Sequence, residues 1–181
     1  MRYLYSIVVI FCVACGDGLQ YQADKYVSYE SMDELVSNIV ECIKNEDATS
    51  LLKILDNDAL IIDLLKQSKG QDALKTKAYL NSKQGQRNYS LDQMNKKERI
   101  RIFLNKGIQQ QLSLNPSAFK STGFEFQSDA DYASGVAAKI QKYQIRLENG
   151  DYQQYTYDIQ VIYCKGKYHL IEAAGFLELQ S

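Results

Sequence analysis

The chain has 181 residues, of which 45% are hydrophobic and 24% charged, so its composition is that of a globular protein with one compact core. A domain of this length buries roughly 68–70% of its unfolded surface, so it folds without a structural metal or a dense disulfide network. The formal net charge is −1, and this balance argues against a nucleic-acid partner, because phosphate binding needs clustered Lys and Arg.

A short apolar segment begins the chain. Arg2 precedes a run from Leu4 to Val13 that only Tyr5 and Ser6 interrupt. The run is about 10 residues long, whereas a helix needs roughly 20 to cross a bilayer. A single positive charge followed by a short apolar run is typical of an export signal, which we place at residues 1–14.

The end of this segment resembles the lipobox of bacterial lipoproteins. Cys12-Val13-Ala14-Cys15 places a small residue before a cysteine, although the family usually has Leu where this chain has Cys12. The resemblance implies that Cys15 is acylated and becomes the membrane-anchored N-terminus, with residues 15–30 as a tether, on the outer membrane or the periplasmic face of the bacterial cell envelope. The alternative is an ordinary secretory signal cleaved near Gly16 or Gly18, which also exports the protein.

Two further cysteines, Cys42 and Cys164, follow in the chain. In an oxidising compartment they can form a disulfide, provided that their Cα atoms lie within roughly 7 Å of each other. The alternative is that both are small buried hydrophobic side chains. The sequence leaves both possibilities open.

Residues 31–181 are predicted to form one domain that begins with helices. Ser31 and Glu34 form a capping box, behind which apolar residues recur at helical spacing up to Ile43. Asp47 can cap a second helix that runs to Leu55. The short break between the two helices predicts a helical hairpin.

A third and a fourth helix are expected further along. Asp58 can cap the third, which Gly70 ends, and residues 71–89 show no clear periodicity. Ser90 and Gln93 form another capping box, at the start of a long helix that ends before the only proline. One side of this helix is basic, with Lys96, Lys97, Arg99 and Arg101. This side either binds phosphate or a membrane surface, or is simply exposed to solvent.

Beyond the proline, apolar residues alternate with polar ones, which predicts antiparallel strands. The strand containing Tyr143 and Ile145 is followed by Asn149-Gly150 and then by the strand containing Tyr155 and Tyr157. A three-residue loop, which places Ile145 opposite Tyr155 and Tyr143 opposite Tyr157, keeps the apolar residues on one face.

A third strand follows the turn at Lys165-Gly166 and runs from Tyr168 to Leu179, where Gly175 marks a bulge or the end of pairing. Helices followed by an antiparallel sheet predict an α+β fold. This order, closed by the Gly166-Lys167-Tyr168 hairpin, resembles the NTF2-like, cystatin-like fold over residues 31–179. The resemblance implies a curved sheet with a cone-shaped pocket, which members of the family use for ligands, for catalysis or for dimerisation.

Residues suited to catalysis are scarce. His169 is the only histidine, so a His-Glu-x-x-His zinc site is impossible, and in a strand a structural or exposed histidine is more common than a catalytic one. Phosphate-binding loops and nucleophile elbows are missing from the sequence. Asp129 and Asp131 begin like a calcium loop, but no glutamate closes it at Ile140. We therefore expect no metal site and no cofactor.

Two carboxylates, Asp158 and Glu172, lie on adjacent predicted strands but on opposite faces if the intervening turn is tight. The remaining candidates are tyrosines that can line a ligand pocket or a partner surface: Tyr143, Tyr155, Tyr157, Tyr163 and Tyr168. The alternative is that they belong to the core, because strands favour tyrosine. We favour a non-catalytic domain that binds a small molecule or a protein, over an NTF2-like enzyme that uses His169 or Asp158 in a cavity.

Overall fold

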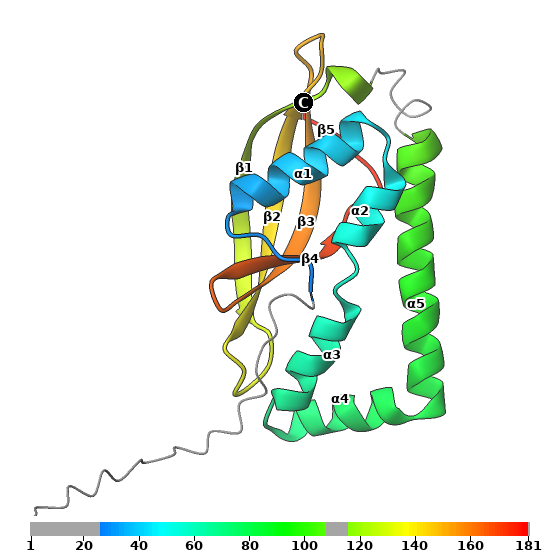
Figure 1. Cartoon of the computed structure of the whole chain (residues 1–181), viewed down its shortest axis with the longest axis vertical. Helices are drawn as coiled ribbons and strands as arrows, with labels where there is room; N and C mark the ends of the chain where they lie inside the picture. Colours follow the sequence, from blue (N-terminus) through cyan, green and yellow to red (C-terminus); the bar gives the residue numbers. More distant parts are fainter. Residues whose placement is uncertain (1–25, 108–115, 181) are drawn as a thin grey trace, which may run out of the picture.

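The computed structural model describes residues 26–107 and 116–180, in which helices precede a sheet (Figure 1). Within these residues the helices are α1 (Met32–Lys44), α2 (Ala48–Ile54), α3 (Asp58–Gln67), α4 (Gln71–Asn81) and α5 (Lys83–Ile102), which a π-helical segment (Phe103–Gly107) extends. A 3-10 turn (Pro116–Ala118) leads to β1 (Lys120–Asp131), β2 (Ala138–Glu148), β3 (Gln154–Cys164), β4 (Lys167–Ala173) and β5 (Glu178–Leu179). The predicted α+β class, with helices before a curved antiparallel sheet, is confirmed.

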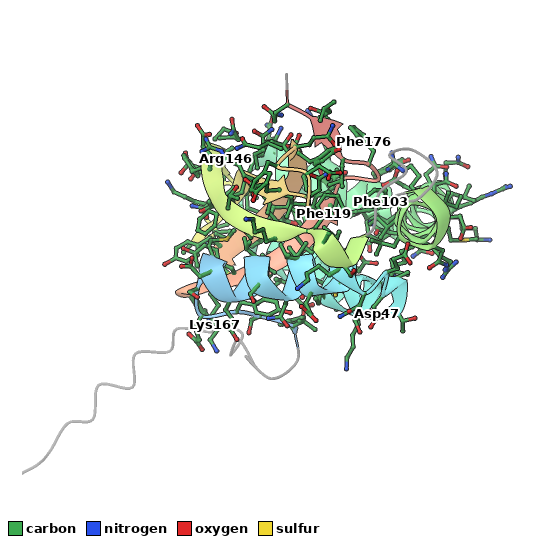
Figure 2. All side chains as sticks on the ribbon, turned by 90° about the horizontal axis from the view of Figure 1, so that it is seen from above. Asp47, Phe103, Phe119, Arg146, Lys167 and Phe176 are labelled. Atoms are coloured by element: carbon green, nitrogen blue, oxygen red, sulfur yellow. The ribbon has the colours of Figure 1, made fainter. Side chains whose placement is uncertain are left out.

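The strands pair in the order β1-β2-β3-β4, and β5 pairs with the free end of β3 beyond the point where β4 stops. Helix α1 covers one face of the sheet, and the upper end of α5 closes the same core from the side (Figure 2). Phe103 follows α5 and lies between this helix and the sheet, where its ring stacks on Tyr157 at 5.8 Å between centroids.

The second half of strand β3 is buried on both faces. Tyr157, Ile159 and Val161 face the core under α1, whereas Ile162 and Cys164 face a second apolar cluster that includes Leu60 and Leu64 of α3. Neighbouring residues of a strand point to opposite faces, so α1 and α3 cover opposite sides of the sheet. The central strand therefore holds two groups of helices together.

The helix-capping predictions are confirmed at the start of the domain and wrong further on. Ser31 accepts a hydrogen bond from the backbone of Glu34, and Asp47 accepts one from the backbone of Ser50. The predicted start at Ser90 is wrong, because α5 already begins at Lys83 with Ser82 as its cap.

Residues 71–89, for which the sequence shows no periodicity, form α4 and the first turns of α5. No described side chain of α4 is buried, so the helix leaves no apolar stripe in the sequence. Asp58 is the first residue of α3 rather than its cap. Asn57 precedes it, and its side-chain amide donates instead to the carbonyls of Ile54 and Leu170.

The predicted hairpin register is wrong by two residues, although its parity is right. Ile145 pairs with Tyr157 and Leu147 with Tyr155, because the loop runs from Asn149 to Gln153. The side-chain oxygen of Asn149 accepts from the backbone of Asp151 and Gln153, and these two bonds stabilise the longer loop. An odd number of loop residues keeps the apolar side chains on one face in either register.

Strand β1 is missing from the prediction. Most of its side chains are exposed, and its pairing with β2 shifts at two bulges, so it lacks the alternation that predicts a strand. Asp129 and Asp131 lie in this strand, which means that they do not form a calcium-binding loop.

The predicted tether also needs correction, and of the two possibilities left open for Cys42 and Cys164 the structure has the second, two buried side chains. Tyr29 forms a β-bridge with Tyr168, so the last residues of the predicted 15–30 tether already belong to the domain. No disulfide joins Cys42 to Cys164; both are buried, in different apolar clusters. The predicted signal peptide and Cys15 lie outside the described residues, within which no helix is long and apolar enough to cross a bilayer.

We expect Phe103→Ala to lower the free energy of unfolding by about 3–5 kcal/mol, because it removes a fully buried ring from the contact between α5 and the sheet. Tyr157→Phe is the matched control. Its hydroxyl is buried without a hydrogen-bond partner, so its removal should change stability by less than about 1 kcal/mol. Urea unfolding measures both values, and equal losses would contradict the packing described here.

Candidate functional site

A cavity of about 470 Å³ opens on the face of the sheet that α1 does not cover, beside α5. Its polar lining comes from five elements: Lys96 and Arg99 of α5, Gln127 of β1, Lys142 and Gln144 of β2, Asp158 and Gln160 of β3, and Glu172 of β4. Ile100, Ala173 and Phe176 add apolar wall, and Figure 2 shows Phe176 on the side of the sheet away from α1. The volume lies in the range of small-molecule sites.

A β-bulge brings the second carboxylate into this cavity. Val161 pairs with Leu170, but Gln160 pairs with Glu172, so Ile171 is an extra residue in β4. The extra residue reverses the parity of the strand, and Glu172 points to the same face as Asp158. The prediction that these carboxylates lie on opposite faces is therefore wrong, although the turn at Lys165-Gly166 is tight.

The end of β4 forms the rim. Pairing stops after Ala173, as the position of Gly175 predicts, and the chain then turns toward α5. Gly175 lies so close to this helix that a Cβ atom in its place would contact Cβ of Arg99 at 3.5 Å. This approach holds the β4–β5 connection against α5 and closes one side of the cavity.

Lys96 is the most enclosed of the cations in the cavity. Its ammonium group donates a hydrogen bond to the carbonyl of Ile171, the bulge residue. Burial lowers the pKa of Lys96, and the nearby carboxylates of Glu172 and Asp58 partly offset that effect. Lys96 therefore links α5 to the bulge and presents its charge beside Glu172.

Asp158 is exposed to the cavity and is held by a neighbour. Gln144 on β2 donates a hydrogen bond of 3.0 Å to its carboxylate, and the Asp158 backbone carbonyl accepts one from Ala174. These bonds position the carboxylate on a rigid part of the sheet. The cavity thus offers a ligand one carboxylate and one ammonium group, Asp158 and Lys96, that hydrogen bonds hold in place.

The five predicted tyrosines do not share this cavity. Tyr155 and Tyr157 are buried in the core at 3% and 0% exposure, where they contact Phe119 and Phe103. Tyr163 and Tyr168 contact each other on neighbouring strands. Tyr143 alone of the five lines the cavity, which leaves most of these residues in structural roles.

His169 does not line the cavity. It is fully buried on β4, and its Nδ1 atom lies 3.0 Å from the carbonyl oxygen of Val27 in the N-terminal segment. Burial lowers the pKa of His169, and nearby Lys167 adds to that effect. The environment suits a neutral structural histidine.

The described residues contain no cluster of His, Cys, Asp and Glu side chains that could hold a metal ion. Comparison of the chain with protein-family models, with curated proteins and with solved structures finds no match. The function is therefore inferred from the residues of the cavity and from the sequence. The sequence does not predict that these polar residues line one cavity, because the bulge at Ile171 and the packing of α5 decide which side chains meet.

We expect the stability of the protein to fall by up to about 1 kcal/mol between pH 7 and pH 5.5 through His169 alone. The pKa of this histidine is lowered in the folded protein, so below about pH 6.5 the unfolded chain binds a proton that the folded protein does not. Because the chain has only one histidine, a His169→Gln variant should lose this part of the pH dependence. Urea unfolding at both pH values measures it, and an unchanged slope in the variant would refute the assignment.

Proposed function

We propose that this protein is a lipid-anchored protein of the bacterial cell envelope whose domain binds a small zwitterionic molecule without catalysis. The observation that carries the ligand proposal is the cavity beside α5, in which cations and carboxylates face the same space. A ligand with one carboxylate and one ammonium group, such as a free amino acid, matches this lining. Lys96, Arg99 and Lys142 are placed to bind the carboxylate, and Asp158 and Glu172 the ammonium group.

The physical argument is charge compensation. Charged side chains that line a partly enclosed space lose part of their hydration, so a ligand that pairs with both signs gains more than one that pairs with either alone. A singly charged ligand leaves one set of side chains without a partner. Discrimination between zwitterions and singly charged analogues is therefore the property to expect of this cavity.

The anchor part of the proposal is supported by the resemblance of Cys12-Val13-Ala14-Cys15 to a lipobox and by the short apolar run before it. Several acyl chains on Cys15 would hold the protein on the membrane, since each buried CH₂ adds about 0.8 kcal/mol of affinity. The proposal also includes an NTF2-like domain, a homodimer and an anchor in the outer membrane or on the periplasmic face. The argument for the ligand does not depend on any of these three.

An enzyme is the second candidate, and one observation favours it. The bulge at Ile171 places Asp158 and Glu172 in one cavity with Lys96, whose pKa is lowered. Carboxylates and a lysine with a lowered pKa are the kinds of groups that general acid–base catalysis uses. His169, the other residue of this hypothesis, is buried away from the cavity and does not support it.

The anchor is tested by the intact mass of the protein purified from membranes of a bacterial host. We expect the mass of residues 15–181 plus acyl groups, and loss of both the acyl groups and membrane association in Cys15→Ala. An unmodified chain that begins at Gly16 or later would replace the anchor with a secreted domain, and it would leave the ligand proposal untouched.

Ligand binding is tested by calorimetry with free L-amino acids against their N-acetyl and carboxamide derivatives, each of which removes one charge. We expect the free amino acids to bind about tenfold more tightly, because a charged side chain that loses water to the ligand without gaining a partner costs about 1.4 kcal/mol. Asp158→Asn should remove this preference. Glu125→Gln, which removes an exposed carboxylate from β1 outside the cavity, is the matched control.

Equal affinity for zwitterions and singly charged derivatives would reject the proposed ligand class. The same mixtures, followed by mass spectrometry, test the enzyme hypothesis. Conversion of a bound compound that stops in Glu172→Gln would replace the non-catalytic assignment with the catalytic one.

A further inference from the structure

One segment at one end of the molecule carries a high net positive charge. Residues 66–87 contain six basic side chains and one acidic side chain, a net charge of +5, while the whole chain has a net charge of −1. The net charge of the rest of the chain is therefore −6. The near-neutral total conceals a strong separation of charge along the molecule.

This segment contains α4, which lies across the end of the molecule and joins α3 to α5 (Figure 1). The β2–β3 loop lies at the opposite end in the same view. Helix α4 contacts these two helices and adds no buried side chain to either apolar cluster among its described residues. Its outward face is thus available to solvent or to a partner.

The outward face of α4 is apolar as well as basic. Leu74 is 62% exposed, and Ala78 and Lys75 lie on the same side of the helix. Tyr79 is 48% exposed, and its hydroxyl accepts a hydrogen bond from the side-chain amide of Asn88 on α5. Lys77 points inward, where its ammonium group donates to the carbonyls of Lys66 and Ser68 at the end of α3. A helix with exposed apolar side chains between lysines is typical of helices that lie on a membrane surface.

The first described residue of the chain, Tyr26, lies beside α3. The hydroxyl of Tyr26 donates a hydrogen bond to Asp63 of α3. Eleven peptide units separate Tyr26 from Cys15, and they can span at most about 40 Å when fully extended. An acylated Cys15 would therefore hold Tyr26, and with it α3, within about 40 Å of the bilayer.

We infer that α4 and its basic flanks form the surface by which the anchored domain rests on anionic phospholipid. This inference depends on the anchor in the proposed function, but not on the ligand cavity. Lysine and arginine near an anionic bilayer are attracted to it, and the rest of the chain, which is acidic, is repelled. The two effects together turn α4 toward the membrane and the β2–β3 loop away from it. A second copy of the chain is a poor occupant of this face, because two +5 segments repel each other.

The orientation can be measured with tryptophan, which this chain lacks. Leu74→Trp places a single fluorophore on the outward face of α4, and Tyr152→Trp places one in the β2–β3 loop, where Tyr152 is 78% exposed. The chain from Cys15 onward, which retains every described residue, is coupled through Cys15 to maleimide-bearing lipid. Cys42 and Cys164 are buried at 6% and 3% exposure, which disfavours their coupling.

Chemical coupling makes the experiment independent of acylation in the cell, so a failed anchor and a failed surface are distinguishable. In phosphatidylcholine vesicles that contain phosphatidylglycerol, we expect brominated lipid to quench the probe at position 74 and to shift its emission to the blue. The probe at position 152 should show neither effect. Vesicles of phosphatidylcholine alone, or high salt, should abolish the difference.

The charge contribution is tested in the Leu74→Trp protein with Lys83→Gln and Arg87→Gln, which remove two exposed cations next to α4. We expect loss of quenching. Lys53→Gln and Lys120→Gln remove the same charge from other elements and should leave the quenching unchanged, with unfolding curves confirming that both proteins fold. Absence of quenching at position 74, or equal quenching at both probes, would overturn the inference; a partner protein would then be the occupant to seek.

Discussion

The double burial of β3 is the constraint on which the rest of the structure depends. One face of the strand places Tyr157, Ile159 and Val161 under α1, and the other places Ile162 and Cys164 under α3. Burial of each such side chain contributes about 1.5–3 kcal/mol, so the strand cannot shift its register by one residue without exposing one apolar set and burying polar groups in its place. Strands β2, β4 and β5 pair directly with this strand, and α1 and α3 pack on its two faces.

The cavity exists because α3 covers only one end of that second face. Toward the other end, the strand presents Asp158 and Gln160 in place of apolar residues, and α5 approaches from the side rather than packing flat on the sheet. The extra residue Ile171 then turns Glu172 toward the same space. A local irregularity in a short strand thus decides the chemistry of the site, as bulges next to functional sites commonly do.

The same architecture separates the two proposed activities in space. The cavity lies between the sheet and the C-terminal part of α5, whereas α4 lies at the end of the molecule and has no buried side chain among its described residues. A helix without a buried face contributes little to the stability of the fold. Its exposed apolar and basic side chains are therefore not explained by packing within the domain. A bilayer within reach of an anchored N-terminus supplies one, and it leaves the cavity open to solvent.

The sequence by itself determined the α+β class, the caps at Ser31 and Asp47, and the parity of the β2–β3 hairpin. These features depend on neighbouring residues, through capping hydrogen bonds and strand alternation. It also contained the basic segment 66–87, which the net charge of the chain hides. Only the tertiary structure decided that α4 and β1 form, because neither has an apolar periodicity of its own and each is held by its neighbours. Tertiary contacts likewise placed Tyr155 and Tyr157 in the core. They also brought Asp158, Glu172 and Lys96 together, because a bulge in β4 and the packing of α5 join residues that are far apart in the sequence.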